Sequence, residues 1–319
     1  MRPHGMALIV CVVCLVNGFS ARAATWYVDQ AAAAGGDGSA VHPFRRINDV
    51  KAVLKTGDTV LVSGGTYEER VDFWHVAAGT GGRTTIKAAP GQQPIVDGGG
   101  GSFVFQAGET PDMTFEGLTV RNAQVGFNFY SSTAGGTPNA DGGQVVSCTT
   151  EAISGNAVEF YLSSHGLVQD CDLQGSVSGK KVDGAIIRGS EIHHASAEGI
   201  TLHADSKNCQ YLGNVVHDNT HVNIYIDSAS NMVVDGNLVY ETGTPPHDQT
   251  GILLADESYP SLGVTSPKLS NITITNNVLT LRRTSSRPGR LLCSSGRVAS
   301  RSARLFICPT AMIVTVPSG

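Results

Sequence analysis

Apolar residues recur in the middle of the chain as a loose repeat. Between residues 113 and 281, an apolar residue is followed, after two intervening positions, by a small or amide residue and then by another apolar residue. Successive intervals of 23, 19, 24, 23 and 40 residues indicate coils of about 23 residues. That period, with short strands and turns between them, is typical of a solenoid whose coils bury their faces against one another. The small or amide positions are Cys148, Cys171, Ser190, Asn214, Asn237 and Asn277, with Leu118 at the matching place of an earlier turn.

A second segment recurs in step with the first and has the alternation of a β-strand. It occurs as GFNFYSS from 126, VEFYLSS from 158, GITLHADS from 199, VNIYIDS from 222 and GILLADES from 251. Side chains of a strand point to opposite faces in turn, which divides these positions into two sets. The predicted inward set is Ile200, Leu202, Ala204, Val222, Ile224 and Ile226. The predicted outward set is Thr201, His203 and Asp205 beside Asn223, Tyr225 and Asp227.

These patterns predict an all-β fold, a right-handed parallel β-helix (solenoid) with a short N-terminal capping helix. The chain has 38 glycines and almost no long amphipathic helical period, and it lacks the LxxLxL and WD signatures of other repeats. We expect the buried amides of Asn214 and Asn237 to stack on each other, because each would satisfy the donors of the next. The alternative is that both are ordinary turn asparagines. Apolar residues from Phe44 to Leu54 predict the capping helix.

Composition divides the chain into four segments. Residues 1–23 have the layout of a cleavable signal peptide, so we expect a secreted protein without a membrane span, acting as a monomer. Residues 24–112 form the predicted N-terminal cap and first coils, and 113–281 the β-helix repeats. Residues 282–319 form an irregular basic tail, either disordered or frame-shifted, with binding to an anionic surface as the functional alternative.

The entry segment resembles that of secreted pectate-lyase-like β-helix proteins, including polysaccharide lyases similar to chondroitinase B and the large pectate lyases. The residues that carry the resemblance read WYVD, GDGS, HPF, GDTVLV and GTYEERV, and with the coils it covers about residues 25 to 281. In such lyases a basic side chain removes the proton next to a uronate carboxylate, and calcium or an arginine neutralises that carboxylate. The resemblance implies architecture more than activity, because many reactions share this scaffold.

Charge limits the choice of partners. All 27 acidic residues lie between Asp29 and Glu257, whereas seven of the 22 basic residues lie between Arg282 and Arg304. The acidic coils argue against nucleic acid, whose phosphates require a basic face. An acidic polysaccharide would need a local basic patch or bridging Ca²⁺. Within the coils, basic residues concentrate at Lys180, Lys181 and Arg188, so we assign Lys181 and Arg188 to substrate binding; the alternative is a turn that keeps a strand edge soluble.

Stacking the outward positions predicts a column of Asp205, Asp227 and Glu257, roughly 4.8 Å apart per coil. Like charges at that spacing repel unless a cation relieves them, and carboxylate oxygens suit Ca²⁺. The column therefore predicts a Ca²⁺ site; the alternative is a solvated row of carboxylates.

The side chains beside this column carry the predicted chemistry. Lys207 is the candidate base, and His203 or Tyr225 the proton donor. Thr201 and Asn223 are the candidate substrate-binding residues. None of these lies in a family motif that matches residue by residue, so only the roles are carried over.

A second polar face follows the amide positions. The third residue on gives His193, His217 and Tyr240, and the fourth gives His194, Asp218 and Glu241. Such a cluster suits acid–base chemistry or a transition metal, although turn-edge histidines are more often plain surface residues. Cys148 and Cys171 are expected to fill space as buried thiols, with a disulfide as the alternative.

The leading hypothesis is an exported lyase that cleaves acidic polysaccharide by β-elimination with Ca²⁺ support. The alternatives are a noncatalytic carbohydrate-binding or surface-structural β-helix and a glycoside hydrolase or epimerase on the same scaffold. The paired-aspartate motifs of β-helix glycosidases are only faintly echoed, by Ser164-His165-Gly166 and Asp256-Glu257.

Overall fold

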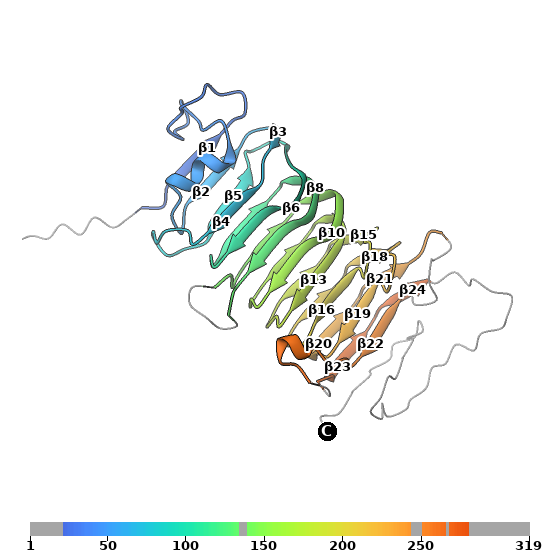
Figure 1. The fold of residues 1–319 in the computed structure, drawn as a ribbon. Coiled ribbons are helices and arrows are strands. Elements are labelled where there is room, and N and C mark those ends of the chain that lie inside the picture. The colour runs from blue at the N-terminus through green and yellow to red at the C-terminus, as the bar shows by residue number, and fades with distance from the viewer. Residues whose placement is uncertain (1–21, 134–138, 244–250, 266–267, 281–319) are drawn as a thin grey trace, which may run out of the picture.

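The computed structural model describes residues 22–133, 139–243, 251–265 and 268–280. The predicted signal peptide, apart from its last two residues, and the predicted basic tail lie outside the described residues. Short parallel strands dominate, and each pairs with strands one coil before and one coil after it. Figure 1 shows these coils stacked along one axis into an elongated body. The chain is a parallel β-helix, as the repeat predicts.

One face of the stack is a ten-stranded sheet with one strand per coil. Its strands, in spatial order, are β1 (Thr25–Val28), β2 (Thr59–Val62), β5 (Thr84–Ala88), β7 (Met113–Glu116), β9 (Gln144–Val146), β11 (Leu167–Gln169), β14 (Ile186–Arg188), β17 (Gln210–Leu212), β20 (Ser230–Asp235) and β23 (Ser270–Thr275).

The other faces belong to a 14-stranded sheet with two wings, joined by three long strands that bend through both. The long strands are β6 (Pro94–Gly108), β8 (Thr119–Tyr130) and β10 (Thr149–Tyr161). The first wing adds β4 (Val71–Trp74), β13 (Ser176–Lys180), β16 (Ile200–His203), β19 (Ile224–Asp227) and β22 (Ile252–Ala255). The second wing adds β3 (Gly65–Glu68), β12 (Asp172–Gln174), β15 (Glu191–His193), β18 (Val215–His217), β21 (Leu238–Tyr240) and β24 (Val278–Thr280).

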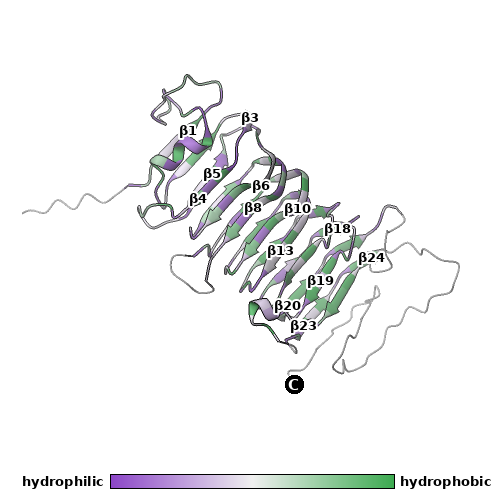
Figure 2. Ribbon diagram, in the orientation of Figure 1, coloured by the Kyte–Doolittle hydropathy of each residue, from purple (hydrophilic) through white to green (hydrophobic). Residues whose placement is uncertain are grey.

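Hydrophobic side chains from every coil fill the interior of the stack, and Figure 2 shows hydrophobic residues recurring in the strands along its length. In the early coils the interior holds stacked phenylalanines, with the rings of Phe105 and Phe115 centred 4.8 Å apart. Burying each such ring contributes about 1.5–3 kcal/mol. All six positions predicted to point inward are buried, which confirms the strand alternation: Ile200, Leu202, Ala204, Val222, Ile224 and Ile226.

A buried ladder of hydrogen bonds connects the small and amide positions of successive coils. Asn214 donates both its backbone N–H (2.9 Å) and its side-chain Nδ2 (3.0 Å) to Asn237 Oδ1. Asn237 in turn donates its backbone N–H to Asn277 Oδ1 at 2.9 Å. The predicted stacking is therefore confirmed, because an ordinary turn asparagine would not bond the next coil. The complete ladder is Cys148, Cys171, Ser190, Asn214, Asn237 and Asn277.

The thiols of this region are buried and unpaired. Cys148, Cys171 and Cys209 form no disulfide. Burial raises the pKa of Cys171 to about 11 and that of Cys209 to about 12, so both stay protonated at neutral pH. Cys148 and Cys171 fill space as small apolar groups, as predicted.

The N-terminal cap contains the 3-10 helix η1 (Ile47–Ala52), which buries Ile47 and Val50. Glu69 accepts the N–H groups of Ile47 and Asn48 at 2.8 and 3.0 Å, so a neighbouring coil caps the helix start. The predicted helix is thus shorter and tighter than an amphipathic α-helix, consistent with buried residues three positions apart. None of the helices in the described residues has the length and hydrophobicity that a bilayer span requires.

Candidate functional site

The last residues of the first-wing strands form a column on the outside of the stack. Strand register places them side by side in successive coils. We call this set the outer column; it comprises Trp74, Gly108, Tyr130, Tyr161, Lys180 and His203. The rings of Tyr130 and Tyr161 are stacked with centroids 5.2 Å apart. The column therefore passes from aromatic residues in the early coils to basic residues in the middle ones.

His203 is the member of the outer column with acid–base capacity. Its Nδ1 lies 3.2 Å from Thr201 Oγ1, and its ring packs against that of Tyr259 with centroids 5.3 Å apart. Burial and the Lys180 ammonium lower the pKa of His203. The ring is therefore neutral at neutral pH. When Nδ1–H donates to Thr201, Nε2 carries the lone pair and can accept a proton.

Lys180 lies directly opposite His203 in the preceding coil. Among the described residues its ammonium makes no ion pair, although Glu159 lies close enough to interact electrostatically. Burial raises the pKa of Glu159, which weakens its ability to neutralise Lys180. An unpaired ammonium beside a neutral imidazole is an arrangement that attracts an anionic ligand.

A group of tyrosines and carboxylates covers the other side of His203. The Tyr225 hydroxyl donates to Glu257 Oε1 at 3.1 Å, and the Tyr259 hydroxyl donates to Asp227 Oδ2. The connection from 256 to 265, which includes the 3-10 helix η2 (Pro260–Leu262), supplies Glu257 and Tyr259. Burial and these carboxylates raise the pKa of both tyrosines, so both hydroxyls stay protonated.

The predicted outward position of Asn223 is wrong. The structure pairs β16 with β19 at Ile200 and Ile224, two residues out of step with the expected alignment of Thr201 with Asn223. Asn223 is fully buried just before β19, where it accepts from Asn219 Nδ2 (2.7 Å) and donates to Glu241 (2.8 Å). Its amide holds a turn, so it cannot bind substrate on the surface. Thr201 keeps its outward position but is 5% exposed.

The predicted column of carboxylates is also wrong in register. Asp227 pairs with Ala255 rather than Glu257, is completely buried, and accepts the N–H of Glu257 at 2.8 Å. Asp205 lies past the end of β16 and contacts the Lys268 ammonium at 3.5 Å. The described residues contain no group of three or more His, Cys, Asp or Glu side chains arranged around a metal ion. These three carboxylates do not fit a shared Ca²⁺ site.

The predicted basic residues are spread over several faces. Lys207 lies in a separate bridge ladder with Asp183 and Ser230, and its Nζ is 3.5 Å from Asp183 Oδ2. Arg188 lies on the ten-stranded sheet and donates to Gln169 Oε1 at 2.6 Å. Lys181 follows Lys180 at a left-handed φ of 52°, where β13 has ended. The structure therefore places Lys180, rather than Lys207, beside His203.

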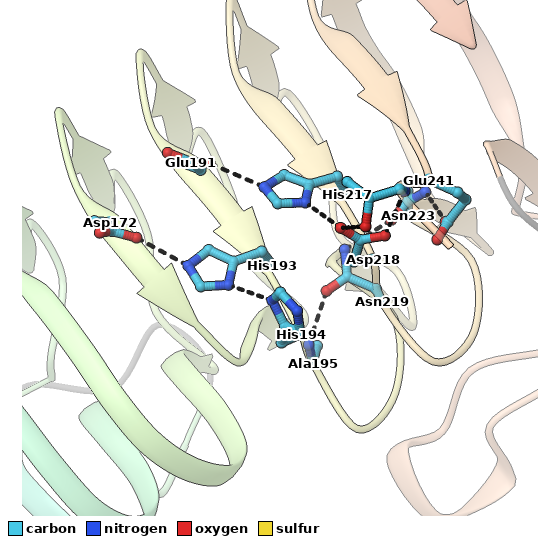
Figure 3. Close-up of polar contacts among 11 residues, drawn as sticks. Asp172, Glu191, His193, His194, Ala195, His217, Asp218, Asn219, Asn223 and Glu241 are labelled. Atoms are coloured by element: carbon cyan, nitrogen blue, oxygen red, sulfur yellow. Dashed lines mark hydrogen bonds and ion pairs between the residues drawn. The ribbon is translucent and has the colours of Figure 1, made fainter. Parts of the chain in front are cut away.

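The second wing carries the predicted cluster of histidines, shown in Figure 3. His193, His217 and Tyr240 are register partners, and their rings stack with centroids 5.4 and 4.5 Å apart. His217 lies between two carboxylates, with Nε2 2.9 Å from Glu191 and Nδ1 2.8 Å from Asp218. The predicted juxtaposition is confirmed.

Most polar groups of this histidine cluster already have partners. His193 contacts Asp172 through Nε2 (2.9 Å) and His194 through Nδ1 (2.7 Å). Burial and the charge of the nearby Asp218 raise the pKa of Glu241. The hydrogen bond that Glu241 accepts from Asn223 lowers this pKa, but by less. Both ring nitrogens of His193 and of His217 already have hydrogen-bonding partners, so few polar atoms of the cluster remain to bind a ligand. The outer column, in which Lys180 makes no ion pair within the part of the chain that the structure describes, is therefore the better candidate site.

The residues that sequence reasoning missed at this site are Lys180 beside His203, Glu159, Tyr259 and the aromatic half of the outer column. A signal for the last was present, because Tyr130, Tyr161 and His203 end equivalent apolar segments in GFNFYSS, VEFYLSS and GITLHADS. Tyr259 gave no such signal, since it lies in a connection outside the repeat.

Comparison with known proteins agrees with this architecture. Residues 137–289 match the family model described as a right handed beta helix region. The chain is thus a right-handed parallel β-helix protein, as predicted, and its fold is that of the pectate-lyase-like proteins it resembles. Comparison with curated protein sequences gives no match.

Several solved structures share the fold at low sequence identity. Pectate lyase Pel9A is 13% identical with a TM-score of 0.58, over 83% of this chain and 78% of that one. A rhamnogalacturonan lyase is 14% identical with a TM-score of 0.56, over 72% of each chain. The GH136 lacto-N-biosidase from Eubacterium ramulus is 12% identical with a TM-score of 0.58, over 81% of this chain and 64% of that one. Such identities establish the fold alone.

Proposed function

We propose that this protein is an exported, monomeric polysaccharide lyase that binds an acidic polysaccharide on the outer column and cleaves it by β-elimination. The observation that carries the proposal is the juxtaposition of Lys180, without an ion pair among the described residues, and His203, whose pKa is lowered. A uronate needs both a cation for its carboxylate and a neutral base for the adjacent C–H. The outer column offers them in neighbouring coils.

Each step of the reaction has a candidate residue. Lys180 pairs with the uronate carboxylate, which makes the neighbouring C–H more acidic. His203 Nε2 takes that proton, the electron pair forms a carbon–carbon double bond, and the bond to the leaving oxygen breaks. Tyr225 donates its proton to the leaving oxygen. Its present acceptor, Glu257, is exposed, so the hydroxyl can turn from the carboxylate to the substrate.

Two further findings support this function. Structures with the same fold include a pectate lyase and a rhamnogalacturonan lyase, which are named for the polysaccharides that they cleave. The first 23 residues have the layout of a signal peptide, which suits a protein that meets polysaccharide outside the cell. A lacto-N-biosidase has the same fold, so the test must distinguish elimination from hydrolysis.

The test uses a panel of uronate polymers and records ultraviolet absorbance, because elimination leaves an unsaturated, absorbing product. Wild type should produce absorbance on at least one polymer. His203→Asn should lower kcat by about 10²- to 10⁴-fold, the usual contribution of a general base. Lys180→Met should raise KM and lower kcat. Lys207→Met is the matched control and should leave both unchanged, since that lysine pairs with Asp183.

Three results would overturn the proposal. Binding without absorbance on any polymer favours a noncatalytic carbohydrate-binding protein, and new reducing ends without absorbance favour hydrolysis. Activity that depends on Lys207 and not on Lys180 would mean that Lys207 is the base, as the sequence alone predicts. The predicted Ca²⁺ dependence is separate, and the same assay tests it with and without a chelator.

A further inference from the structure

A cavity of about 690 Å³ lies at the N-terminal end of the stack, away from His203. The cap and the first coil of the first wing form its walls. The lining residues that matter here are Trp26, Lys51, Lys55, Asp72, Trp74 and His75. Two indoles and two lysines around one cavity are a combination suited to an anionic ligand with flat, apolar faces.

Trp74 belongs to both the cavity and the outer column. It is 42% exposed, an unusual degree for a tryptophan, and its ring is centred 5.8 Å from that of Tyr130 two coils away. Gly108 makes this reach possible: a Cβ there would lie 2.0 Å from the Trp74 ring atom Cε3. The glycine of the intervening coil therefore lets the indole lie across it and leaves the outer side of the ring open to solvent.

The lysines of the cavity are available for a ligand. Lys51 and Lys55 are exposed, and neither forms an ion pair within the described residues. The nearby Asp58 is 4% exposed and is engaged by the N–H groups of Ala24 and Lys55 and by Trp26 Nε1, which fixes the cavity wall. Arg22 also lines the cavity, but the predicted signal cleavage removes it, so the two lysines supply the positive charge.

The outer column links the cavity to the proposed active site, because Trp74 belongs to both. The outer column runs from Trp74 through Gly108, Tyr130, Tyr161 and Lys180 to His203 in five coil steps. At the spacing of parallel strands these steps cover about 24 Å. Beside the column runs a polar row in which Asn128 donates to Gln106 at 2.9 Å and Gln106 to Asp72 at 3.2 Å. An extended saccharide along the column would meet rings on one side and amides on the other.

We propose that this cavity is a distal binding site for the same polysaccharide, with Trp74 stacking on a sugar ring and Lys51 and Lys55 pairing with uronate carboxylates. The inference rests on the proposed function and extends it: the protein should prefer chains long enough to reach from His203 to Trp74. Short oligosaccharides would bind near Lys180 alone.

The experiment measures Kd by calorimetry for purified uronate oligosaccharides of increasing length, in the His203→Asn background so that nothing is cleaved. Affinity should rise once the chain is long enough to reach Trp74. Trp74→Ala should remove that rise, weakening the longest oligosaccharide about tenfold, the effect expected of an aromatic anchor, and leaving the shortest unchanged. Gly108→Ala should do the same with the indole still present, because its Cβ displaces the ring.

Two controls make the outcomes distinct. Lys180→Met should weaken every length, and Tyr240→Ala, an aromatic truncation in the histidine cluster, should weaken none. If Trp74→Ala and Gly108→Ala both keep the length-dependent rise while Lys180→Met still weakens binding, the distal site is overturned and the proposed function stands. If no oligosaccharide binds at any length, both are overturned. Circular dichroism of each variant confirms that the β-helix is intact.

Discussion

His203 takes its properties from the coils on either side of it. The preceding coil supplies Lys180, whose positive charge opposes protonation of the imidazole, and the ring itself is partly withdrawn from water. The following coils supply Asp227, which favours protonation but is itself buried under Tyr259. Burial and Lys180 are the stronger causes, and the pKa of His203 is lowered from its usual 6.5. A residue that is neutral at neutral pH acts as a base rather than as an acid.

The pH dependence of His203 follows directly from these causes. An NMR titration should give His203 a pKa below 6.5 in wild type, and Lys180→Met should raise it by removing a neighbouring cation. Because the folded-state pKa is lowered, the unfolded chain binds more protons below pH 6.5, and His203 destabilises the fold as pH falls through that range. A wild-type pKa at or above 6.5, or no change in Lys180→Met, would contradict this environment.

At the residue scale, sequence reasoning placed His203 and Tyr225 on the outside of the stack, as the structure does, but misplaced Asn223. Strand alternation is a property of the sequence, so the inward and outward sets could be predicted. The register between coils is set by contacts that the repeat does not reveal. Leu202 N–H donates to Tyr211 Oη at 3.1 Å instead of to β19, and the two residues after β16, Ala204 and Asp205, adopt left-handed φ values of 55° and 72°. These features end β16 and shift the alignment.

At the element scale, two ladders tie the coils together, and they differ in burial. The inner ladder through Asn214 and Asn237 is enclosed by the core. An outer ladder joins Asn208, Asn231 and Asn271, whose side chains bond one another at 3.0 Å at the surface. All three outer residues have left-handed φ, which asparagine tolerates better than most residues. Water can replace the outer bonds but not the inner ones, so only the inner ladder should matter greatly for stability.

Removing one member of each ladder separates these contributions. Asn237→Ala leaves the N–H of Asn214 without its partner in the core, removes the side-chain bond to the carbonyl of Tyr211, and should cost roughly 2–5 kcal/mol of the free energy of unfolding. Asn231→Gly keeps the left-handed backbone available and should cost less than about 1 kcal/mol. Denaturant unfolding of both variants makes the comparison. Equal losses would show that the buried ladder has no special role.

The elements themselves were largely predictable. The ladder positions and the short strands around them follow from the period of the repeat, because each coil must place one small polar residue at the same bend. The sequence did not predict the long strands β6, β8 and β10, each of which bends through both wings. Glycines and polar residues within them interrupt the alternating pattern of a strand. The cap formed where its apolar residues predicted it, although as a 3-10 helix.

At the scale of the whole molecule, the outer face is polarised along the axis of the stack. The N-terminal end has aromatic residues and two lysines that form no ion pair among the described residues. Lys180 and His203 lie in the middle, and tyrosines with carboxylates lie beyond them. The connections after β10, β13, β16 and β19 are short, whereas those after β8 (131–143) and β22 (256–269) are long. Short connections at the ends of these four strands suit a polymer that lies along the axis.

The most direct test is a crystal structure of His203→Asn with a bound uronate oligosaccharide. The account predicts a saccharide chain lying along the outer column, with one carboxylate within hydrogen-bonding distance of Lys180 Nζ and a sugar ring against Trp74. A saccharide seated instead on the histidine cluster of the second wing, or on the outer column without a carboxylate near Lys180, would contradict it.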